Sequence, residues 1–251
     1  MGSEFEGPRT AIVTGGAKRI GAALARALAA EGWHLLIHYR NSESEARALA
    51  AELGAASIVQ AELGEPAAAE RIVGAAEGLP PLRLLVNNAS RFEEDCALSI
   101  DASGWDEHFD VNVRAPALLS KAFAASSPGG LIVNILDAKL AAPNPDFFSY
   151  TVSKMAFAGL TELLARALAP RIRVCAIAPA VTLVSGEQSG DNFEKVHRLN
   201  ALGRGVEPAD IVRALRFIVA SPTFTGQTIT LDGGQRFLSL PRDVQFLETD
   251  G

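Results

Sequence analysis

The sequence predicts a single-domain α/β protein, a doubly wound Rossmann fold around a seven-stranded parallel sheet. Short β-branched segments alternate with Ala/Leu-rich segments of helical period along the chain. The strand segments are apolar throughout, as expected when helices cover both faces of a parallel sheet. The first strand also runs into a glycine-rich turn, TGGAKRIG at 14–21, just before the first helix. With 251 residues, 48% of them hydrophobic, the chain can bury one large core.

The elements follow in order from this alternation. The expected strands are 10–15, 34–39, 57–62, 82–88, 130–136, 171–179 and 226–234. The expected helices are near 20–31, 42–53, 66–77, 102–126, 150–169 and 208–220. Together they form a domain over 8–240.

Three further segments have no regular pattern. The polar, glycine-containing segment 180–205 follows the sixth strand, and its length predicts a lid over a site. Residues 1–7 are expected to be a disordered or added N-terminal segment. The tail, 241–251, either covers a neighbouring subunit's site with the help of Arg236 or is mobile.

Composition excludes several classes of function. The net charge of −6 argues against nucleic acid and against a membrane surface as partners, because both are polyanionic. No apolar run approaches the ~20 residues of a membrane span, and no signal peptide opens the chain. Two distant cysteines fit a reducing compartment, so we expect a cytoplasmic protein. The four histidines have no ligand spacing, and no metal site is predicted.

The turn at 14–21 predicts a pyrophosphate site. Glycines let backbone N–H groups and the positive end of a helix approach phosphate oxygens that a Cβ would obstruct. Lys18 and Arg19 add positive charge beside the phosphates, or Arg19 reaches over the cofactor to a polar substrate. The expected cofactor contacts in this turn are Thr14, Gly15, Lys18, Arg19, Ile20 and Gly21.

The end of the second strand indicates which dinucleotide binds. An acidic residue there would accept hydrogen bonds from a ribose 2′-OH and repel a 2′-phosphate. This chain has Tyr39, Arg40, Asn41 and Ser42 instead. An arginine beside a Ser/Asn helix start forms an anion site, which favours NADPH over NADH. A solvated surface arginine is the alternative, because Glu43 lies close by.

A tyrosine and a lysine four residues apart, Tyr150 and Lys154, predict a proton-transfer site. On a helix these positions share one face, so the ammonium group can lie near the phenol. A nearby cation would lower the pKa of the phenol and allow proton exchange near neutral pH. The lysine could also hydrogen-bond the ribose of the nicotinamide.

Taken together, these segments resemble the short-chain dehydrogenase/reductase family along nearly the whole chain. The shared motifs are TGGAKRIG, NNAS (87–90), FDVNV, Tyr150 with Lys154, IAPA and LDGG. The resemblance implies a homotetramer, and a proton relay in which Asn112 joins Tyr150 and Lys154. It also implies cofactor contacts from Glu62, Leu63, Asn88, Ala89, Ser90, Tyr150, Lys154, Pro179 and Val181. Ala180 and Glu62 depart from the family's usual glycine and aspartate.

Asp137, thirteen residues before Tyr150, stands where the family usually has serine. An ionised carboxylate would repel the alkoxide formed in ketone reduction. A carboxyl group suits hydride transfer to a C=N bond, whose nitrogen must be protonated, and burial would raise its pKa and keep the proton available.

Together with the HYRNSESEA and NNASRF segments, this substitution resembles the pteridine and dihydromonapterin reductases. The resemblance implies a pterin or dihydrofolate-like substrate that contacts Arg19, Ser90, Phe92, Asp137, Tyr150 and Leu183, with Phe92 stacked on the ring. Two alternatives remain open at this point. One is a 3-oxoacyl or other keto reductase, and the other is a non-catalytic protein that senses NADPH.

Overall fold

The computed structural model describes residues 5–184 and 190–247. Its centre is a seven-stranded, fully parallel sheet in the order β3-β2-β1-β4-β5-β6-β7. The strands are β1 (Thr10–Val13), β2 (His34–Tyr39), β3 (Ala56–Gln60), β4 (Leu82–Asn87), β5 (Gly130–Ile135), β6 (Ile172–Pro179) and β7 (Thr228–Leu231). The predicted doubly wound α/β fold is confirmed.

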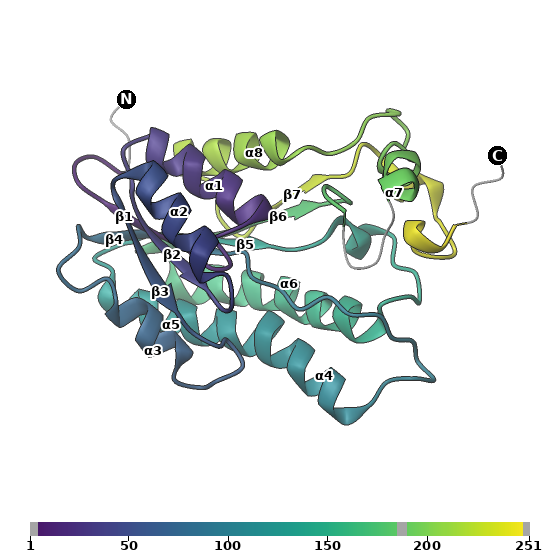
Figure 1. The fold of residues 1–251 in the computed structure, drawn as a ribbon, viewed down its shortest axis with the longest axis horizontal. Helices are drawn as coiled ribbons and strands as arrows, with labels where there is room; N and C mark the ends of the chain where they lie inside the picture. Colours follow the sequence, from purple (N-terminus) through teal and green to yellow (C-terminus); the bar gives the residue numbers. More distant parts are fainter. Residues whose placement is uncertain (1–4, 185–189, 248–251) are drawn as a thin grey trace.

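Helices cover both faces of the sheet (Figure 1). One face carries α1 (Arg19–Ala30), α2 (Glu43–Leu53) and α8 (Pro208–Ala220). The other carries α3 (Ala68–Gly74), α4 (Ala102–Phe109), α5 (Ala115–Ser126) and α6 (Phe148–Leu168). The central strands are apolar on both sides because each side packs into its own core: Leu24 and Leu215 lie in one, Ile72 and Phe123 in the other.

Two helical segments differ in detail from what the sequence predicts. The helix expected over 102–126 is interrupted by a π-helical turn, Asp110–Arg114, between α4 and α5. A π turn inserts one extra residue without changing the apolar pattern, so periodicity does not reveal it. The irregular segment 180–205 contains a helix, α7 (Gly190–His197), and its residues 185–189 lie outside the described part of the chain.

Both ends of the described chain pack on the domain. Phe5, within the expected N-terminal segment, is buried, and its ring lies 5.4 Å from that of Trp33; residues 1–4 lie outside the description. At the other end, 3-10 turns at Gln235–Leu238 and Val244–Phe246 follow β7, and the second contacts α7 (Figure 1). The C-terminal tail therefore reaches the same end of the sheet as the lid segment.

Within the described ranges, no helix has the length and apolar character needed to cross a membrane.

Candidate active site

A cavity of about 560 Å³ opens at the carboxyl ends of the strands. In a doubly wound sheet this is where ligands bind, next to the point where the strand order reverses between β1 and β4. Its walls come from the turn before α1, the end of β2, the loops after β4, β5 and β6, and the C-terminal tail. The volume falls in the range of small-molecule sites.

The glycine turn is shaped for close approach of a ligand. Gly15 has φ +59°, and a Cβ on Gly21 would lie 2.2 Å from the Gly15 carbonyl oxygen. Thr14 Oγ1 accepts hydrogen bonds from the backbone N–H groups of Asn88 and Ala89, at 2.9 and 3.0 Å. Asn88 Nδ2 donates back to the Thr14 carbonyl at 2.9 Å. The turn is thus fixed to the end of β4.

His38 also supports this turn, a role that its sequence position did not reveal. The Gly15 N–H donates to His38 Nδ1 at 3.2 Å, and His38 Nε2 lies 3.1 Å from the Ala61 carbonyl oxygen. This arrangement requires a neutral ring protonated at Nε2. Burial lowers the pKa of His38, which favours that neutral form.

Four residues at the end of β2, Tyr39 to Ser42, line the cavity as predicted for a 2′-phosphate site. Arg40 also lies 3.7 Å from Glu62, and Lys18 lies 2.5 Å from Glu45, both pairs being largely exposed. Exposed ion pairs of this kind are weak, so a phosphate can compete for either cation.

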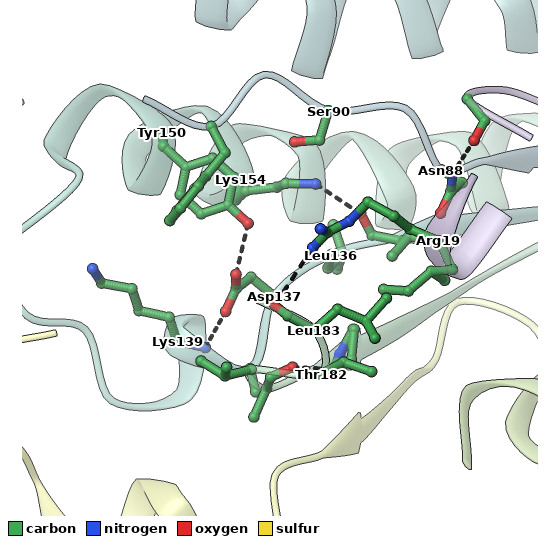
Figure 2. A pocket seen from close by; sticks show the side chains of 18 of the residues that line it. Arg19, Asn88, Ser90, Leu136, Asp137, Lys139, Tyr150, Lys154, Thr182 and Leu183 are labelled. Atoms are coloured by element: carbon green, nitrogen blue, oxygen red, sulfur yellow. Dashed lines mark hydrogen bonds between the residues drawn. The ribbon is translucent and has the colours of Figure 1, made fainter. Parts of the chain in front are cut away.

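Three of the four predicted catalytic residues, Asp137, Tyr150 and Lys154, meet at one wall of the cavity (Figure 2). Tyr150 Oη donates a 2.6 Å hydrogen bond to Asp137 Oδ2, and the Lys139 N–H donates to Asp137 Oδ1 at 2.7 Å. Lys154 Nζ donates to the Ile135 carbonyl at 2.9 Å. β5 positions the carboxyl group, and the first two turns of α6 position the phenol and the ammonium group.

The pKa values of this cluster correct one prediction and confirm another. Burial raises the pKa of Asp137, as expected. Burial and the neighbouring Asp137 charge also raise the pKa of Tyr150 well above its usual value, so the expectation that Lys154 lowers it is wrong for this arrangement. Burial lowers the pKa of Lys154 to about 8. Tyr150 therefore keeps its phenol proton at neutral pH and donates it to Asp137.

Asn112, the expected relay residue, lies in the π turn and is fully buried. Its Oδ1 accepts from the Arg91 N–H at 2.8 Å and from Ser90 Oγ at 3.1 Å. Its Nδ2 donates to the Arg91 carbonyl and to Ser153 Oγ. These four contacts use the whole side-chain amide, and none of them reaches Lys154.

Phe92, expected to stack on the substrate ring, lines the cavity and is stacked against Phe147 at 4.3 Å and edge-on to Tyr150 at 4.6 Å. Phe147 in turn stacks on Phe246 of the tail at 5.5 Å. Phe147 holds a left-handed backbone, φ +52°, just before α6. This strained conformation sits next to the site, as such conformations often do.

Arg19 reaches across the cavity to the segment after β6 (Figure 2). Its guanidinium group donates to the carbonyl of Val184 at 2.6 Å and more weakly to that of Leu183. Arg19 itself has φ +54° at the start of α1. The residue thus connects the phosphate turn to the predicted substrate wall.

Most predicted site residues line this cavity, and four do not. Thr14 and Asn112 are buried behind it, Glu62 faces Arg40, and Leu63 is buried in the core below β3. The structure adds cavity residues that sequence patterns did not identify, among them Lys139, Ala142, Asn144, Thr182, Gln235, Leu240, Asp243, Val244 and Gln245. Arg236, expected to reach a neighbouring subunit's site, lines the cavity of its own chain. Arg236 binds Asp232 of its own chain at 2.7 Å.

Comparison with known proteins gives one family and several relatives. The short chain dehydrogenase family matches residues 9–194. The crystal structure of FolM alternative dihydrofolate reductase 1 from Brucella suis in complex with NADP is 41% identical, with a TM-score of 0.87, and the match covers 91% of this chain and 95% of that one. Human dehydrogenase/reductase SDR family member 4 is 31% identical, covering 90% of this chain and 87% of the relative. A 3-oxoacyl-[acyl-carrier-protein] reductase from Synechocystis is 29% identical, covering 90% and 96%.

Proposed function

Because the chain belongs to the short-chain dehydrogenase family, we propose that it is an NADPH-dependent reductase that transfers hydride to a C=N bond of a dihydropterin or dihydrofolate-like substrate. Solved structures similar to it hold NADP, and two of them are of proteins named FolM alternative dihydrofolate reductase 1. The Asp137–Tyr150 hydrogen bond is the observation that carries the proposal.

The residues of the cavity fit a phosphorylated dinucleotide. A Cβ at Gly21 would collide with the Gly15 carbonyl, so glycine is needed for the tight turn that brings the start of α1 to the cavity, where the helix N-terminus can meet phosphate. Lys18 and Arg40 are cations in exposed, exchangeable pairs near the two places where phosphates would lie. When bound, NADPH supplies the hydride.

The chain's own residues supply the proton. Asp137 is held by Tyr150 and by the Lys139 N–H, and burial raises its pKa, which favours a proton on the carboxyl group. As hydride reaches the carbon of the C=N bond, the nitrogen gains negative charge and takes that proton. The ammonium group of Lys154, fixed by the Ile135 carbonyl, then lies near a newly formed carboxylate and stabilises it.

Ketone reduction is the competing function, and the Synechocystis relative is named for it. Ketone reduction forms an oxyanion near Tyr150. That oxyanion would face Asp137, which accepts the Tyr150 hydroxyl's hydrogen bond at 2.6 Å. A carboxyl group there stabilises a protonated nitrogen better than an alkoxide.

The test is NADPH oxidation with dihydrobiopterin, dihydromonapterin and dihydrofolate beside a panel of ketones and 3-oxoacyl thioesters. We expect turnover of the pterin-type substrates to fall by about 10²- to 10⁴-fold in Asp137→Ser, the usual contribution of a general acid. Asp137→Asn, which keeps the shape and the hydrogen bond, serves as the matched variant. Ketone turnover that survives or rises in Asp137→Ser would contradict the proposal.

A further inference from the structure

The C-terminal tail is tied to the catalytic loop by an ionic cluster made of Lys139, Asp146, Arg242 and Asp243. Lys139 Nζ donates to Asp243 Oδ2 at 3.2 Å and to the Asp146 carbonyl at 2.6 Å. The Asp146 carboxylate accepts from Arg242 Nε, at 2.8 and 2.9 Å, and from the Asp243 N–H at 2.7 Å. About one hundred residues of sequence separate the two halves of this cluster.

Lys139 therefore makes hydrogen bonds both to Asp137 and to the C-terminal tail. Its backbone N–H donates to Asp137, whereas its ammonium group points away from Asp137 and toward the tail (Figure 2). The Lys139 and Asp243 side chains are only 9% and 14% exposed, so solvent screens their charges weakly. Both residues line the cavity beside Asp137.

We propose that Lys139 and Asp243 are positioning residues: through their ion pair and the Lys139 backbone N–H, the C-terminal tail acts on the acid Asp137. This inference rests on the proposed function only for its kinetic readout, because the titration of Asp137 can be followed without a substrate.

The charges around Asp137 support this assignment. Lys154 lies on α6 together with the Tyr150 hydroxyl, Lys139 lies in the turn after Asp137, and Asp243 lies in the tail. The Asp243 carboxylate raises the pKa of Asp137, whereas the Lys154 charge lowers it. The Lys139 ammonium group, 3.2 Å from Asp243, opposes the field of that carboxylate. Asp146 and Arg242 neutralise each other on the outer side of the cluster.

Two substitutions should therefore move Asp137 in opposite directions. Lys139→Met leaves Asp243 unopposed, so the pKa of Asp137 should rise. Asp243→Asn leaves the Lys139 charge unopposed, so that pKa should fall. For charges this close in a poorly screened site, we expect each displacement to be roughly half a pH unit or more. The double variant should lie between the two single variants, near the unchanged protein.

The experiment follows the ¹³Cγ resonance of Asp137 against pH in protein labelled at aspartate, the signal being identified by its loss in Asp137→Asn. The pH profile of kcat/KM is the second readout, and its fall on the alkaline side should move up in Lys139→Met and down in Asp243→Asn. Lys139→Arg should restore the original position. Arg166→Gln, which removes a cation from an exposed pair on α6, is the control and should move neither curve.

The inference would be overturned if the pKa of Asp137 moved in the same direction in Lys139→Met and Asp243→Asn, or if it moved in neither variant. If Asp243→Asn does not fold, a Lys139→Met profile equal to that of Lys139→Arg would overturn it just as well. Opposite displacements of the ¹³C titration without pterin turnover would support the inference and contradict the proposed function, so the two failures are distinguishable.

Discussion

At the scale of single residues, the buried ammonium group of Lys154 is a costly charge, because desolvation disfavours its protonated form. It has one hydrogen bond, to Ile135, and its Nζ lies 5.7 Å from the centre of the Tyr150 ring. Its pKa of about 8 means that the folded protein releases a proton which the unfolded chain keeps until its ordinary value near 10.5. The lysine is retained at the expense of stability, which is typical of functional groups.

Lys154→Met should reveal this cost. Between pH 8 and about 10.5 the unfolded chain binds more protons than the folded one, so Lys154 makes the protein more stable as pH rises. We expect the free energy of unfolding of the unchanged protein, relative to Lys154→Met, to rise by up to about 1.4 kcal/mol per pH unit across that window. Urea unfolding at pH 7, 8, 9 and 10 measures it. A difference that is constant with pH would contradict the lowered pKa.

At the scale of elements, the start of α6 is held by a side chain from another loop. Phe147, directly before the helix, has no capping oxygen, and Asp95 of the loop after β4 accepts from the Ser149 N–H at 3.0 Å instead. Because Tyr150 is the next residue, this cap also fixes the position of the phenol. An acidic group at a helix N-terminus is favourable for the helix dipole as well.

Asp95→Ala should therefore lower both stability and activity. Loss of a capping side chain typically costs about 1 kcal/mol, and a displaced Tyr150 should reduce kcat more than it raises KM. Asp95→Asn keeps an oxygen acceptor and should retain most of both properties. Thermal unfolding and steady-state kinetics of the two variants provide the comparison. Equal loss in both would mean that the charge, and not the cap, is what matters.

Some of these elements and site residues can be predicted from sequence patterns, and others cannot. All seven strand segments were predicted because apolar β-branched runs are local, and Asp137 with Tyr150 followed from their spacing. The π turn carrying Asn112 leaves no trace in the pattern, and α7 has a polar sequence that resembles a loop. The contact of Lys139 with Asp243 depends on the complete fold, so no local pattern could predict it.

At the scale of the whole molecule, a buried polar chain joins two strands to the catalytic helix. Asn87 Nδ2 of β4 donates to Asn134 Oδ1 of β5 at 2.8 Å, and Asn134 Nδ2 donates to Thr161 Oγ1 of α6 at 2.9 Å. Thr161 Oγ1 donates to the Phe157 carbonyl. Such a chain fixes the helix against the sheet in one orientation, because any other arrangement leaves buried polar groups unpaired.

Thr161→Val removes one link of this chain and leaves Asn134 Nδ2 without its acceptor. We expect a loss of about 1–3 kcal/mol in the free energy of unfolding, the cost of an unsatisfied buried donor. Thr161→Ser keeps the hydroxyl and loses only a methyl group, so its loss should be smaller. Chemical denaturation of both variants is the measurement. A valine variant as stable as the serine variant would show that the link contributes little.

The position of the tail also has a practical consequence for anyone handling the protein. The tail places Asp243 and Gln245 in the cavity wall, whereas Phe5 packs on Trp33 beside the amino end of β2, at the opposite end of the strands. A purification tag, fluorophore or surface tether on the last residues would pull on that wall of the cavity. The same attachment on the first residues would leave that wall untouched, so immobilised or fused forms should be joined through the N-terminus.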